Sequence, residues 1–114
     1  ALKAFSMWSL GSVVAEYLDG VCASGIYEAR LGREEYAGPN EDREVATYCA
    51  GYKAEDLPEI LRISDHVIFN SPGQIARFRP IINEARAAGE VFDIGLRINP
   101  LHAEGEVAKY DPCQ

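Results

Sequence analysis

The chain has 114 residues, 47% of them hydrophobic, so it can bury one core and is too short for two. Its formal net charge of −7, with no local basic patch, argues against a nucleic-acid partner. The sequence contains neither a signal peptide nor an apolar run near the roughly 20 residues of a membrane span, so we expect no membrane partner. Three widely spaced cysteines, Cys22, Cys49 and Cys113, fit a reducing cytoplasm better than a disulfide scaffold.

Apolar periodicity and breaker residues predict strands and helices in regular alternation. In chain order, we expect a strand at 1–5, a helix at 7–18, a strand at 21–23, a helix at 24–35, a strand at 45–50, a helix at 55–63, a strand at 66–69, a helix at 72–88 and a strand at 92–98. Ser24 and Ser71 are the predicted N-caps of their helices. Pro80 predicts a break or kink within the fourth helix, because proline removes a hydrogen bond and clashes with the preceding turn.

This order predicts an α/β fold with parallel strands and right-handed crossovers. A doubly wound sheet and a partial (β/α)8 TIM barrel both fit, but the first turn lacks the glycine-rich dinucleotide fingerprint. A whole barrel needs about 250 residues. We therefore expect about five strands of a barrel. The chain starts without methionine on a residue that reads as strand interior, so we expect an interior piece of a longer protein.

Polar residues follow the predicted strands at their carboxyl ends, where barrel enzymes keep their chemistry. They are Lys3, Ser24, Tyr48, Asn70, Ser71, Arg97 and Asn99. For Ser24, Asn70 and Ser71, helix capping is the simpler interpretation. Lys3 and Arg97 have apolar neighbours, and a charged residue buried there must be paired or functional. A lysine in a dry site can form a Schiff base with an aldehyde, whereas Arg97 suits a phenolate, carboxylate or phosphate oxygen.

The other titratable residues give weaker indications of a functional site. Glu28 can pair with Lys3 or remain solvated, and His66 begins a strand at the opposite end of the barrel, where a structural role is expected. His102 lacks partners at useful spacing, and the cysteines form no CxxC pair, so we expect no metal. The sequence contains no nucleophile elbow, P-loop or HExxH motif.

Five segments together resemble the fold-type III pyridoxal-phosphate decarboxylases, a group with ornithine and diaminopimelate decarboxylases and alanine racemase. The segments are 1–6, 19–24, 28–32, 68–71 and 95–100, in order and with compatible spacing. Residues 104–107 and 110–113 are most similar to carboxynorspermidine/carboxyspermidine decarboxylases. Val21 departs from the ornithine decarboxylase pattern, which has an acid at this position.

The resemblance implies that Lys3 holds the pyridoxal 5'-phosphate aldehyde and that Arg97 lies near the cofactor's phenolic oxygen. It implies decarboxylation of carboxynorspermidine or carboxyspermidine to norspermidine or spermidine in a cytoplasmic homodimer. Residues 1–114 would form the N-terminal half of the barrel domain, without the C-terminal β domain. We expect the isolated piece neither to bind the cofactor tightly nor to turn over.

Three alternatives remain open at this point. The first is another decarboxylase of the same fold, such as the diaminopimelate enzyme. The second is a non-catalytic pyridoxal-phosphate carrier, which is a lone barrel that also places a lysine on its first strand. The third is an α/β interaction domain without a cofactor.

Overall fold

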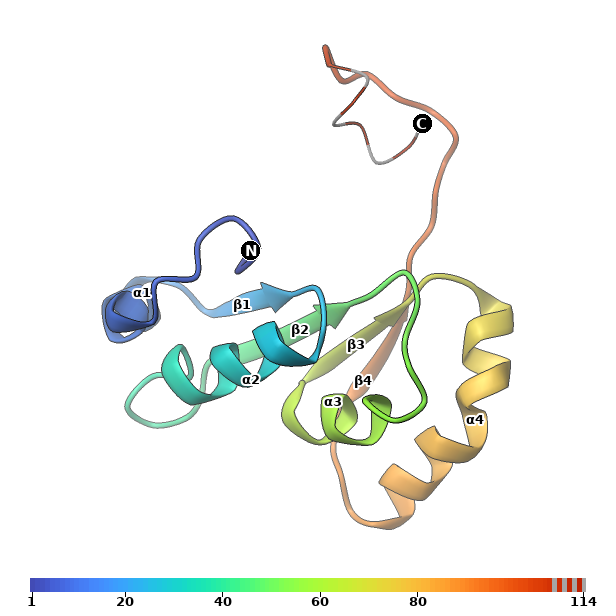
Figure 1. Cartoon of the computed structure of the whole chain (residues 1–114), viewed down its shortest axis with the longest axis horizontal. Helices are drawn as coiled ribbons and strands as arrows, with labels where there is room; N and C mark the ends of the chain where they lie inside the picture. Colours follow the sequence, from blue (N-terminus) through green and yellow to red (C-terminus); the bar gives the residue numbers. More distant parts are fainter. Residues whose placement is uncertain (108, 110, 112, 114) are drawn as a thin grey trace.

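A computed structural model describes residues 1–107, 109, 111 and 113 of the chain. The elements alternate as predicted, with four strands among the described residues (Figure 1). In order they are the 3-10 helix η1 (Trp8–Leu10), α1 (Gly11–Tyr17), β1 (Gly20–Ala23), α2 (Ile26–Glu35), β2 (Glu44–Tyr48), α3 (Leu57–Ile63), β3 (His66–Phe69), α4 (Pro72–Ala87) and β4 (Asp93–Leu96).

The four strands form one parallel sheet in the order β1-β2-β3-β4. Because each strand pairs with its successor, every crossover returns the chain to the neighbouring position, as in a barrel. The predicted α/β fold is therefore confirmed, and the strand order is consistent with a partial TIM barrel.

Apolar side chains on one face of the sheet make the core. In β2 and β3 the buried residues alternate with more accessible ones, and the buried set is Val45, Thr47, Val67 and Phe69. Val67 and Phe69 pack in one cluster with Leu57 of α3 and Phe78 of α4. The molecule measures 19 Å along its shortest axis, which is the thickness of about two layers.

The predicted first strand is not formed. Residues 2–4 are a turn, in which Ala4 N and Phe5 N donate to Ala1 O at 3.0 and 3.2 Å. Only Leu2 N makes a ladder-like bond, to Cys22 O of β1 at 3.0 Å. Local bonding to Ala1 thus ends the extended conformation after one residue.

Of the break or kink predicted at Pro80, the break is wrong, because α4 continues from Pro72 to Ala87 through this proline. Phe78 and Ile82, on either side of Pro80, are 3% exposed and belong to the same apolar cluster. Burial of both side chains offsets the hydrogen bond that proline cannot make.

The two predicted N-caps have different outcomes. Ser71 caps α4 as expected, since its Oγ accepts from Gln74 N at 3.1 Å. The N-cap of α2 is Gly25 and not Ser24, and no side chain caps it. Ser24 instead donates its backbone N–H to Glu28 Oε2 at 2.7 Å.

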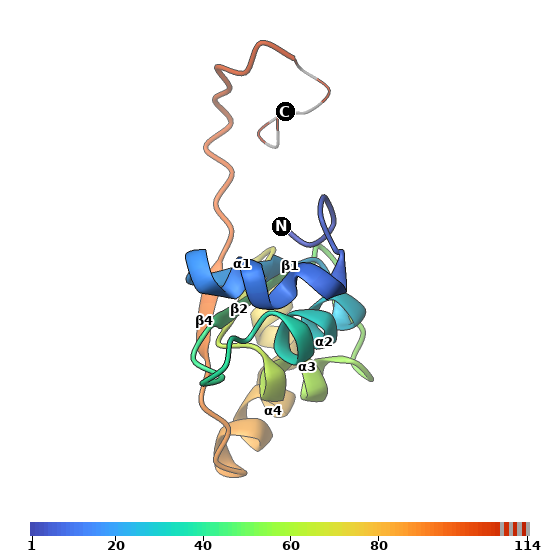
Figure 2. The same cartoon turned by 90° about the vertical axis from the view of Figure 1, so that its left-hand side faces the viewer.

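Beyond β4 the chain leads away from the sheet, on the same side as the N-terminal turn (Figures 1 and 2). Residues 110 and 112 of the closing motif lie outside the described residues. In the part of the chain that the structure describes, no helix is both long and apolar enough to cross a membrane.

Candidate active site

Three of the predicted polar residues meet at the carboxyl ends of β2, β3 and β4. Tyr48 ends β2, Asn70 follows β3, and Arg97 follows β4. Arg97 N donates to Phe69 O at 2.9 Å, so the parallel ladder continues one residue past β4. This extension brings Arg97 level with Asn70, as expected for strand ends that share one edge of a sheet.

Asn70 is the centre of this cluster. Its Oδ1 accepts from the Tyr48 hydroxyl at 2.8 Å and from Arg97 Nη1 at 3.4 Å. The Arg97 guanidinium carbon also lies 5.7 Å from the centroid of the Tyr48 ring, within cation–π range. Arg97 is half-buried, and its pairing agrees with the expectation for a cation among apolar neighbours.

Gln74, in the first turn of α4, connects two of these strand ends. Its Oε1 accepts from Asn70 N at 2.8 Å, and its Nε2 donates to Ala50 O, just after β2, at 3.1 Å. Gln74 was not among the residues predicted for the site. The motif Ser71-Pro72-Gly73-Gln74 could have indicated it, because serine followed three residues later by glutamine is the pattern of a capping box.

Lys3 lies in the N-terminal turn, beside the end of β1, and its side chain is exposed. Leu2, directly before it, is 2% exposed, so the backbone at this point is anchored while the amine faces outward. Lys3 thus lies at the β1 edge of the described sheet, whereas the Tyr48–Asn70–Arg97 cluster lies at the ends of β2, β3 and β4. The two predicted site residues therefore lie on the same rim, Lys3 beside β1 and Arg97 after β4.

Glu28 does not pair with Lys3. Among the described residues its carboxylate accepts from Ser24 N, which favours the structural interpretation of both. His66 lies at the opposite end of the strands, as predicted, between Glu44 and Asp93 at 3.1 and 3.5 Å.

His102 contacts Glu104 at 3.1 Å in the segment after β4. The described part of the chain holds no group of three or more His, Cys, Asp or Glu residues arranged to bind a metal ion. The three cysteines are free.

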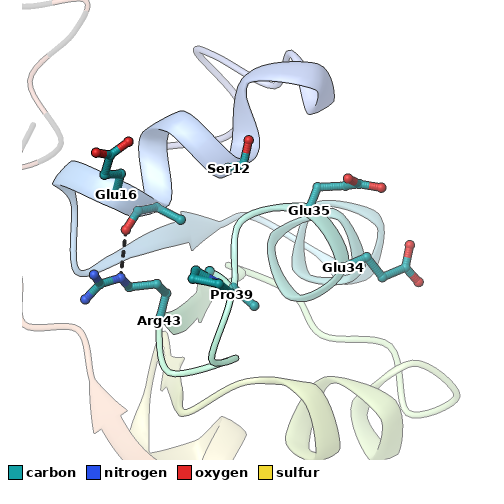
Figure 3. Close-up of a pocket in the computed structure, with 9 residues that line it drawn as sticks. Ser12, Glu16, Glu34, Glu35, Pro39 and Arg43 are labelled. Atoms are coloured by element: carbon teal, nitrogen blue, oxygen red, sulfur yellow. Dashed lines mark hydrogen bonds between the residues drawn. The ribbon is translucent and has the colours of Figure 1, made fainter.

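A cavity of about 530 Å³ lies elsewhere, between α1, the end of α2 and the loop before β2 (Figure 3). Ser12, Glu16, Glu34, Glu35 and Arg43 contribute to its lining. Arg43 donates its Nε to Ala15 O at 2.8 Å and so ties the loop to α1. The Arg43 side chain is engaged by a backbone carbonyl, and the cavity is remote from the carboxyl ends of the strands. We therefore assign a structural role to the residues that line this cavity.

Comparisons with known proteins agree with the sequence resemblance, although no family model matches. The chain is 34% identical over 113 residues to a carboxyaminopropylagmatine decarboxylase of Synechocystis sp., covering 99% of this chain and 27% of that protein. It is 31% identical over 113 residues to a carboxynorspermidine/carboxyspermidine decarboxylase of Campylobacter jejuni, covering 99% of this chain and 26% of that protein. A protein of the same name from Herminiimonas arsenicoxydans is 33% identical over 100 residues, covering 88% of this chain and 24% of that protein.

A solved structure shares the fold. The crystal structure of Campylobacter jejuni carboxynorspermidine decarboxylase complexed with norspermidine superposes with a TM-score of 0.70 at 28% identity, covering 94% of this chain and 26% of that one. The chain thus spans about a quarter of the length of the curated relatives it matches. These findings confirm the predicted resemblance to carboxynorspermidine/carboxyspermidine decarboxylases.

Proposed function

We propose that this chain forms part of a longer pyridoxal-phosphate-dependent decarboxylase that converts carboxynorspermidine or carboxyspermidine to norspermidine or spermidine. The observation that carries the proposal is the match over 99% of the chain to a relative with this name. In our proposal residues 1–114 contribute about half of a barrel domain, and the whole enzyme is a cytoplasmic homodimer with a further β domain.

Lys3 and Arg97 carry functional groups that suit the cofactor. Lys3 offers a primary amine, the group that condenses with an aldehyde. Arg97 offers a permanent cation with planar donors, which suits a phenolic oxygen. Lys3 would hold the aldehyde carbon and Arg97 would face the phenolic oxygen. When bound, pyridoxal phosphate supplies the electron sink for the electron pair that remains when carbon dioxide leaves.

The contribution of this chain is positioning and charge. Leu2, buried beside β1, fixes the backbone from which the Lys3 amine projects. With substrate bound, the Lys3 amine would be the group that holds a proton, at Nζ, for the reacting carbon. Arg97 keeps its charge throughout, and its contacts with Asn70 and Tyr48 fix the direction of its donors. The net charge of −7 suits a polycationic substrate.

A second substrate has its own support. The relative from Synechocystis sp., 34% identical to this chain, is named for carboxyaminopropylagmatine. The names of all three relatives refer to a carboxylated polyamine. The alternative substrates therefore differ in the part that is remote from the carboxylate. Selection between them would depend on residues that contact this remote part.

The test is carbon dioxide release by the full-length protein loaded with pyridoxal phosphate. The substrate panel is carboxynorspermidine, carboxyspermidine, carboxyaminopropylagmatine and diaminopimelate. We expect release from one or both of the first two and a loss of at least about a thousandfold in kcat for Lys3→Ala, because covalent catalysis needs the amine. Lys53→Ala, at an exposed lysine between β2 and α3, is the matched control and should retain activity.

Each of the other outcomes has a definite meaning. Release from carboxyaminopropylagmatine alone would replace the proposed substrate by the second one. Release from diaminopimelate alone would favour the related decarboxylase. Cofactor binding without any release would favour a carrier, and a fully active Lys3→Ala variant would contradict the role of Lys3.

A further inference from the structure

The contacts of Asn70 are more than a helix cap requires. Its amide oxygen accepts from Tyr48 and Arg97, and its backbone N–H donates to the side chain of Gln74. Helix α4 already has its cap in Ser71. The side chain of Asn70 therefore bonds to residues at the ends of the neighbouring strands β2 and β4 and does not cap the helix that follows it.

The orientation of the Asn70 amide follows from its partners. A guanidinium can only donate, so the group that faces Arg97 must be the amide oxygen. A carbonyl oxygen has two lone pairs, and Tyr48 and Arg97 account for both. The Arg97 guanidinium is thus held from one side by the Asn70 oxygen and from another by the face of the Tyr48 ring.

Gln74 in turn fixes Asn70. It accepts from the Asn70 backbone at 2.8 Å and donates to Ala50 O at 3.1 Å, so it connects the segments after β3 and β2. Its own backbone N–H is held by Ser71 Oγ, within the first turn of α4. The chain of contacts therefore runs from the start of α4 through Gln74 and Asn70 to Arg97.

We propose that Asn70 is a positioning residue that sets the direction of the Arg97 guanidinium toward an anionic oxygen at the strand ends, with Gln74 as its anchor. This inference rests on the proposed function, in which that oxygen belongs to pyridoxal phosphate. An arginine that is held in place before binding loses less side-chain entropy when it meets the anion. Loss of the Asn70 amide should thus weaken cofactor binding while the fold is retained.

The experiment is a double-mutant cycle on the full-length protein, read by absorbance titration of the apoprotein with pyridoxal phosphate. We expect Asn70→Ala to raise the Kd about tenfold, and to raise it less than about twofold when Arg97 is already alanine. Asn83→Ala is the matched control, since Asn83 is exposed on α4, and it should leave the Kd unchanged. Gln74→Ala should raise the Kd in the same direction, again only while Arg97 is present.

A cooperative thermal unfolding transition will show whether each variant is folded. If Asn70→Ala does not fold, Gln74→Ala tests the proposal in its place. An unchanged Kd in Asn70→Ala, or an equal effect with and without Arg97, would overturn the positioning role. The proposed function fails separately, if the unmodified protein neither binds pyridoxal phosphate nor releases carbon dioxide.

Discussion

Tyr52 connects β2 and β3 from within the core. Its side chain is 6% exposed, and its hydroxyl lies 3.0 Å from Thr47 O and 2.9 Å from Ile68 O, the two possible acceptors of its proton. Its ring packs against Phe69 with centroids 5.1 Å apart. Since Thr47 directly precedes Tyr48 and Ile68 is the register partner of Tyr48, this hydroxyl supports the geometry of the strand ends.

We expect Tyr52→Phe to lower the free energy of unfolding by about 1–3 kcal/mol, because carbonyl oxygens in the interior lose their donor. Burial raises the pKa of the Tyr52 phenol, so the native state favours its neutral form. This contribution is therefore present below the unfolded-state pKa of about 10 and is lost as the pH rises above it.

Urea denaturation of the full-length protein at pH 7 and pH 10.5 measures both effects of Tyr52→Phe. Tyr27→Phe, at a side chain that is 79% exposed, is the control and should stay within about 0.5 kcal/mol of the unmodified protein. Equal stability of Tyr52→Phe and Tyr27→Phe at pH 7 would contradict the structural role of the hydroxyl.

The meeting of Tyr48, Asn70 and Arg97 could be predicted from the sequence, because parallel strands end at one edge. The turn at Lys3 could not be predicted from apolar character, since a strand also needs ladder partners and only Leu2 has one. The link through Gln74 could not be predicted in the same way. In a capping box its side chain would accept from the backbone N–H of the N-cap Ser71, but it accepts from that of Asn70. Propensity alone does not specify that choice.

At the scale of elements, α1 and α2 approach so closely that one of them must contribute glycine. A methyl group at Gly11, the first residue of α1, would lie 2.1 Å from Glu35 O at the end of α2. Gly11 has ordinary helical backbone angles, so any effect of alanine there would be steric.

We expect Gly11→Ala to lower the free energy of unfolding by about 1–3 kcal/mol, because the helices must move apart. Gly73→Ala is the matched control in the first turn of α4. Among the described residues, a methyl group there comes within 4 Å of Ser71 Oγ alone, at 3.8 Å. That substitution should stabilise the protein by about 0.4–1 kcal/mol through the unfolded chain. Urea denaturation of both variants checks the pair, and a neutral Gly11→Ala would contradict the close packing.

Most elements could be predicted from periodicity and breaker residues, but Pro80 shows the limit of local rules. The rule that proline breaks a helix considers one turn, whereas α4 is held by Phe78 and Ile82 in the shared core. The sequence pattern does not reveal that tertiary gain.

At the scale of the whole molecule, the described sheet buries alternate residues of β2 and β3 against helices. On the other face of the sheet, the side chains are only half-buried, and they are those of Ala46, Tyr48 and Ile68. A closed barrel would cover this set with layers from further strands. This agrees with our proposal that the chain is about half of a barrel. It is also why we expect the isolated piece to lack tight cofactor binding.

The central claim is that Lys3 holds the cofactor, and reductive trapping tests it most directly. The chain contains three lysines, Lys3, Lys53 and Lys109. The full-length protein loaded with pyridoxal phosphate is reduced with borohydride, digested, and mapped by mass spectrometry. We predict a pyridoxyl group on Lys3. A label on Lys53, on Lys109 or on a lysine outside this chain, in an enzyme that decarboxylates, would contradict the claim.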